Sequence, residues 1–97
     1  MSTARVGLIG LGTVGTGVAR LLRERREEIR ARTGMDLELV GAADVRRERA
    51  KALKLPARIF TTDAKALLAR EDLDIVIELI GGLEPARSFI RAALAKG

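Results

Sequence analysis

The chain has 97 residues, 47% of them hydrophobic, which is enough for one small domain but not for two. It contains neither histidine nor cysteine, which excludes disulfide bonds, the usual zinc sites and catalysis by Ser-His-Asp or Cys-His groups. Its net charge is +5, but Trp and Tyr are absent and only two Phe are present, so side chains on which bases could stack are nearly lacking. Many arginines stand beside glutamates, which is typical of solvated helix faces, and we expect no nucleic-acid partner.

Short β-branched segments alternate with helical patterns along the whole chain, which predicts a parallel α/β sheet. A strand at 5–9 is followed by one long helix from about 14 to 29, which Gly34 closes. Three further strands are expected at 37–43, 59–60 and 74–80, with helices at 47–53 and 64–69 between them. Pro85 suits the first turn of a last helix running to about Lys96. No linker or repeat interrupts this series, so we expect a single domain over residues 1–97.

A glycine-rich loop directly follows the first strand and opens the first helix. It has the pattern G-x-G-x-x-G, made of Gly10, Leu11, Gly12, Thr13, Val14 and Gly15. Gly10 permits a tight turn, Gly12 lets a pyrophosphate approach the backbone, and Gly15 allows close packing of helix and strand. The free N–H groups of the helix start favour phosphate, and the Thr13 hydroxyl could add a donor. The pattern therefore predicts a dinucleotide site, the alternative being a turn that is merely rich in glycine.

Asp44 ends the second strand, where an acid in a dinucleotide-binding fold hydrogen-bonds the adenosine ribose. Its separation from the loop exceeds the usual spacing of about 20 residues. Val45 follows, and then Arg46 and Arg47, which leave room for a 2′-phosphate, so both NAD and NADP stay open. In the alternative interpretation, Asp44 caps the next helix and the arginines face solvent.

The fourth strand ends at Ile80, Gly81 and Gly82. In the sheet order 3-2-1-4 of dinucleotide-binding folds, ligands bind between strands one and four, so these residues would face the glycine loop near the nicotinamide. A simple structural turn fits them equally well. Glu78 is either a buried, partnered carboxylate or a residue at the strand end, and the sequence does not choose between the two.

Two segments together resemble the cofactor-binding half of homoserine dehydrogenase: RVGLIGLGTVGTGVA at 5–19 and DIVIELIGGLEPA at 74–86. The resemblance covers essentially the whole chain. It implies a Rossmann-type three-layer fold, with helices on both faces of the sheet, that is incomplete after the fourth βα unit. It also implies an NAD(P)-dependent oxidoreductase that interconverts aspartate 4-semialdehyde and homoserine in the cytoplasmic biosynthesis of threonine and methionine. By matching position, residues 10–15 would hold the pyrophosphate, Asp44 to Arg46 the adenosine ribose, and Ile80 to Gly82 the nicotinamide end.

The family's fifth strand, its lysine-bearing loop and its substrate-binding, dimerising domain would all lie beyond residue 97. None of Lys51, Lys54, Lys65 and Lys96 lies in a motif that matches the catalytic lysine, so we expect a fragment that binds cofactor but has no catalytic residue and no metal site of its own. The fragment would self-associate through the exposed edge of its fourth strand, while the parent enzyme would be a homo-oligomer. Two alternatives are a stand-alone NAD(P)-sensing module and the cofactor half of another enzyme, acting on aspartate or dihydrodipicolinate. A basic nucleic-acid-binding domain is a more distant one.

Overall fold

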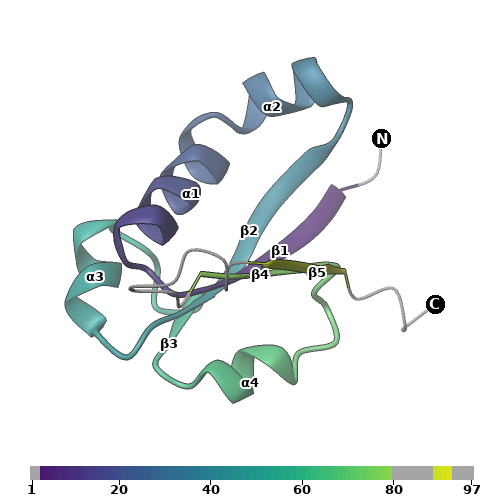
Figure 1. The fold of residues 1–97 in the computed structure, drawn as a ribbon. Coiled ribbons are helices and arrows are strands. Elements are labelled where there is room, and N and C mark those ends of the chain that lie inside the picture. Colours follow the sequence, from purple (N-terminus) through teal and green to yellow (C-terminus); the bar gives the residue numbers. More distant parts are fainter. Residues whose placement is uncertain (1–2, 80–88, 93–97) are drawn as a thin grey trace.

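A five-stranded sheet with the order β3-β2-β1-β4-β5 is the frame of the chain (Figure 1). The structure, a computed structural model, describes residues 3–79 and 89–92. The elements in chain order are β1 (Thr3–Ile9), α1 (Thr13–Glu24), α2 (Arg26–Thr33), β2 (Asp36–Ala43), α3 (Arg47–Ala52), β3 (Phe60–Thr61), α4 (Ala64–Leu68), β4 (Ile75–Glu78) and β5 (Phe89–Ala92). The four predicted strands and the first three predicted helical regions are thus present. The first helical region is divided into α1 and α2, and the ends of the other elements differ by a residue or two.

β1 pairs in parallel with β2 on one side and with β4 on the other, and β2 pairs in parallel with β3. This confirms the predicted order 3-2-1-4. Because side chains alternate along a strand, Leu8 and Ile9 enter different apolar clusters, on opposite faces of the sheet. One cluster includes Ala19 of α1, and the other includes Leu67 of α4. The helices α1 and α4 accordingly cover opposite faces (Figure 1), which confirms the three-layer fold.

The single helix predicted for residues 14–29 is wrong, because α1 ends at Glu24 and α2 begins at Arg26. Arg25 between them has φ −119° and ψ 26°, outside the helical range. The guanidinium of Arg26 donates to both carboxylate oxygens of Asp36, at 2.7 and 2.9 Å. This paired contact ties the start of α2 to the start of β2. Gly34 does end α2 in the left-handed conformation, with φ 76°, as predicted.

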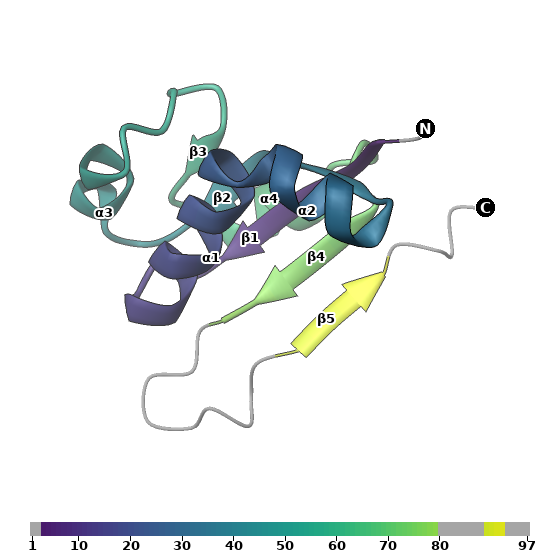
Figure 2. The same ribbon diagram turned by 90° about the horizontal axis from the view of Figure 1, so that it is seen from above.

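The helix predicted from Pro85 to Lys96 is also wrong, since residues 89–92 form β5, antiparallel to β4 (Figure 2). A strand at this place supplies backbone partners to the outer edge of β4, which a helix would leave unpaired. Phe89 and Ile90 have high strand propensity. β4 is therefore not an edge strand here, and the premise for self-association through it does not hold. Among the helices of the described part, none is long and apolar enough to cross a membrane.

Candidate functional site

The glycine loop leaves β1 through a turn that an L side chain would strain. Gly10 has φ 102°, and its N–H donates to the carbonyl of Ala43 at 2.8 Å. This bond joins the loop to the end of β2. A Cβ placed on Gly15 would lie 1.8 Å from the carbonyl oxygen of Gly10, so α1 packs against the turn at a distance that only glycine allows. The two outer glycines of the motif thus have the structural roles that the pattern predicts.

Gly12, the middle glycine, stands in a different environment. Apart from adjoining backbone, the nearest atom of the described residues to a Cβ placed there is Nη1 of Arg49, at 3.8 Å. Among the described residues, a Cβ on Gly12 would thus make only an ordinary van der Waals contact with the end of the Arg49 side chain, and none of them requires glycine at this position. Gly12 is the N-cap of α1 without a side-chain capping bond, and its carbonyl accepts the first helical bond, from Thr16 N–H at 2.8 Å.

The first two residues of α1, Thr13 and Val14, are exposed next to Gly12. The initial N–H groups of an α-helix have no intrahelical acceptor, and here they belong to Thr13, Val14 and Gly15. Val14 is 64% exposed, although it is a large apolar residue. Amide donors, the positive end of the helix dipole and an accessible apolar side chain make this a surface that suits a phosphate-bearing ligand.

Asp44 is buried and holds the glycine loop by hydrogen bonds. Its Oδ2 accepts from the Leu11 N–H at 2.6 Å and from Nη1 of Arg49 at 3.1 Å, and its Oδ1 accepts from the Arg46 N–H at 2.8 Å. Burial raises the pKa of the Asp44 carboxyl, but the two amide bonds and the Arg49 guanidinium outweigh this effect and leave the pKa below its ordinary value. The carboxylate therefore stays charged near neutral pH.

The predicted residues Leu11, Asp44, Val45 and Arg46 thus come together with the loop at the carboxyl ends of β1 and β2. Val45 and Arg46 are exposed. Asp44 does not cap α3, because Arg46 is the N-cap of that helix and has no side-chain capping bond. Arg49 completes the group and was missed by the sequence analysis. Arg49 lies in the first turn of the helix that follows Asp44. Arginines at such positions generally face solvent, so its place in the sequence does not distinguish it.

The predicted residues Ile80, Gly81 and Gly82 lie outside the described residues. The chain just before them runs beside the end of β1, since the N–H of Leu79 donates to the carbonyl of Ile9 at 2.8 Å. Within the described ranges, no group of three or more acids could hold a metal ion.

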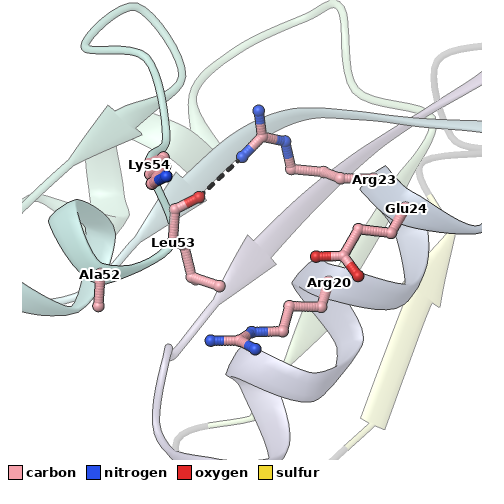
Figure 3. Close-up of a pocket in the computed structure, with 6 residues that line it drawn as sticks. All are labelled: Arg20, Arg23, Glu24, Ala52, Leu53 and Lys54. Carbon is pink, nitrogen blue, oxygen red and sulfur yellow. Dashed lines mark hydrogen bonds between the residues drawn. The ribbon is translucent and has the colours of Figure 1, made fainter.

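A separate hollow lies between the last turns of α1 and the end of α3 (Figure 3). It is lined by Arg20, Arg23, Glu24, Ala52, Leu53 and Lys54. Arg23 donates to the carbonyl of Leu53 at 3.0 Å, and this bond closes α3. The glycine loop is at the opposite end of α1, so the hollow is no part of the loop site.

Comparison with known proteins places this geometry in a family. Residues 10–97 match the family model described as the NAD binding domain of homoserine dehydrogenase. The chain is 38% identical over 97 residues to the homoserine dehydrogenase of Neisseria gonorrhoeae, covering 100% of this chain and 22% of that protein. For the Corynebacterium glutamicum homoserine dehydrogenase the identity is 43% over 98 residues, covering 99% and 21%.

Among solved structures, the chain is similar to a homoserine dehydrogenase from Thiobacillus denitrificans. The TM-score is 0.71 at 45% identity, over 90% of this chain and 20% of that one. A homoserine dehydrogenase from S. aureus gives a TM-score of 0.70 at 30% identity, over 89% of this chain and 22% of that one. The chain therefore spans about a fifth of the length of these relatives.

Proposed function

Because the chain belongs to the family of homoserine dehydrogenase NAD-binding domains, we propose that it holds NAD or NADP for the interconversion of aspartate 4-semialdehyde and homoserine. The observation that carries this proposal is the contrast within the glycine loop. Gly10 and Gly15 are required by the fold itself, whereas a Cβ on Gly12 would meet, among the described residues, only Nη1 of Arg49 at an ordinary contact distance of 3.8 Å. A loop kept free of side chains at a helix N-terminus is what close approach of a pyrophosphate needs.

The proposed placement of the dinucleotide follows the sheet. Residues 10–15 hold the pyrophosphate by backbone N–H groups, and Asp44 to Arg46 border the adenosine ribose. Ile80 to Gly82 border the nicotinamide end, because ligands of open α/β sheets bind between the strands on either side of the switch point, here β1 and β4. The nicotinamide supplies the hydride chemistry, and the contribution of this chain is to position and orient it.

We infer that the substrate-binding and catalytic groups, and the contacts that make a homo-oligomer, belong to the remaining four-fifths of length that the relatives have. The proposal places the reaction in the cytoplasm, with the biosynthesis that it serves.

Calorimetric titration of NAD and of NADP into the chain tests this function. We expect saturable binding of at least one of them, with one site per chain. A chain that is folded by circular dichroism and binds neither dinucleotide would refute the proposal.

A further inference from the structure

The guanidinium of Arg49 lies between Asp44 and the glycine loop. Its Nη1 is 3.1 Å from Oδ2 of Asp44 and 3.8 Å from the position of a Cβ on Gly12. The Arg49 side chain is 37% exposed, whereas the Asp44 side chain is 5% exposed. Arg49 therefore presents a cation to solvent between Asp44 and Gly12, where the adenosine ribose would lie.

The acid behind Arg49 is already largely occupied. A carboxylate has about four acceptor positions, and the bonds from Leu11 N–H, Arg46 N–H and Arg49 fill three of them. In a site selective for NAD, the acid accepts from the ribose hydroxyls and repels a 2′-phosphate by its charge. Here the charge is paired with a guanidinium, and few acceptor positions are left for the ribose.

The surrounding charge also favours an anion. Residues 44–49 contain three arginines and two acids, and one of these acids, Asp44, is paired inside the fold. Arg46 and Arg47 are exposed beside it. A guanidinium has five N–H donors in a fixed plane, and the hydrogen bond from Arg49 to Asp44 takes up one of them.

We propose that Arg49 binds the 2′-phosphate of NADP. The end of β2 can then accept the phosphorylated dinucleotide although it carries an acid, Asp44. The inference rests on the proposed function, since it requires a dinucleotide over the glycine loop. It assigns Arg49 as a residue that determines specificity, and it predicts that the chain binds NADP at least as tightly as NAD.

The test compares the affinities of NAD and NADP, by calorimetry, for the unchanged chain, for Arg49→Gln and for a control, Arg58→Gln. Arg58 is exposed, precedes β3 and lies outside both the glycine loop and the segment 44–49, so the control removes the same charge elsewhere. Charge-assisted hydrogen bonds to phosphate are about twice as strong as neutral ones. Arg49→Gln should therefore weaken the binding of NADP about tenfold or more and change the affinity for NAD by less than about threefold. The control should change neither affinity.

Each result decides a different question. If the unchanged chain binds neither dinucleotide, the proposed function itself fails. If both bind and Arg49→Gln leaves the ratio of the two affinities unchanged, Arg49 does not contact the 2′-phosphate and only this inference is overturned. Should Arg49→Gln not fold, the unchanged chain still decides, because NADP must then bind at least as tightly as NAD and lose affinity more steeply with added salt. Weaker NADP binding, or equal salt dependence, would overturn the inference.

Discussion

Replacing Gly15 by alanine should destabilise the fold, although the same change favours an isolated helix. The added Cβ would stand 1.8 Å from the carbonyl oxygen of Gly10 and 2.8 Å from its carbonyl carbon. A backbone carbonyl cannot turn away as a side chain can, and Gly10 is held at φ 102° by its bond to Ala43. The turn or the helix must therefore move by about 1.2 Å to restore even the 3.0 Å that real Cβ contacts respect.

Overpacking of this kind costs about 3 kcal/mol, and the better helix propensity of alanine returns about 1 kcal/mol. We expect a net loss of about 2 kcal/mol, which lowers the midpoint of thermal unfolding by at least about 8 °C in a domain of this size. Gly17 in the same helix is the matched control, because a Cβ there meets no atom of the described residues within 4 Å. Gly17→Ala should raise the midpoint by about 4 °C.

Thermal unfolding followed by circular dichroism separates the two variants. If Gly15→Ala is as stable as the unchanged chain, or moves in the same direction as Gly17→Ala, α1 does not pack against the turn as closely as the structure has it, and the argument for the loop geometry is refuted.

Three further predictions concern the site and its surroundings. Gly12→Val should abolish dinucleotide binding in a titration. It should change the unfolding free energy by no more than about 1 kcal/mol, because among the described residues a Cβ there meets only the end of the Arg49 side chain, at 3.8 Å. A variant with unchanged affinity would contradict the proposed pyrophosphate site. Lys54 has φ 58°, so Lys54→Gly should stabilise the chain by about 0.5–1 kcal/mol in chemical denaturation, whereas Lys51→Gly, inside α3, should destabilise it by about 1 kcal/mol. Because the pKa of Asp44 is lowered in the folded chain, its contribution to stability is present above its unfolded pKa of about 3.9 and is lost as the pH falls through the folded value. Asp44→Asn should therefore lose less unfolding free energy than the unchanged chain between pH 5 and pH 2, measured by chemical denaturation. An equal loss in the two proteins would count against this role of Asp44.

The central strands could be predicted because their signals are local. Residues 74–80 are almost continuously apolar, as a strand covered on both faces must be. The break at Arg25 carries no such signal, since the segment around it has high helix propensity and neither glycine nor proline. The residue after the break, Arg26, contacts Asp36, ten positions later at the start of β2. A pairing across elements of this kind is invisible to periodicity.

The last segment fails for a related reason. Pro85 and the alanines after it favour a helix locally, but the edge of β4 needs backbone partners, and β5 supplies them. The helix propensity of a short segment is a weak effect compared with the cost of leaving a row of backbone groups unpaired.

At the site, the sequence could identify which backbone positions must lack side chains, but not which acceptors are still open. An acid at the end of the second strand is a sign of ribose binding only if its oxygens face the ligand. Asp44 instead directs Oδ2 to the amide of Leu11, 33 residues earlier in the chain, and shares that oxygen with Arg49. The same carboxylate thus fixes the shape of the loop and, through its ion pair, places a cation beside it. If Arg49 binds the 2′-phosphate as proposed, dinucleotide preference at this site depends on how many acceptor positions of Asp44 the fold leaves vacant, and the type of residue at position 44 does not determine it alone.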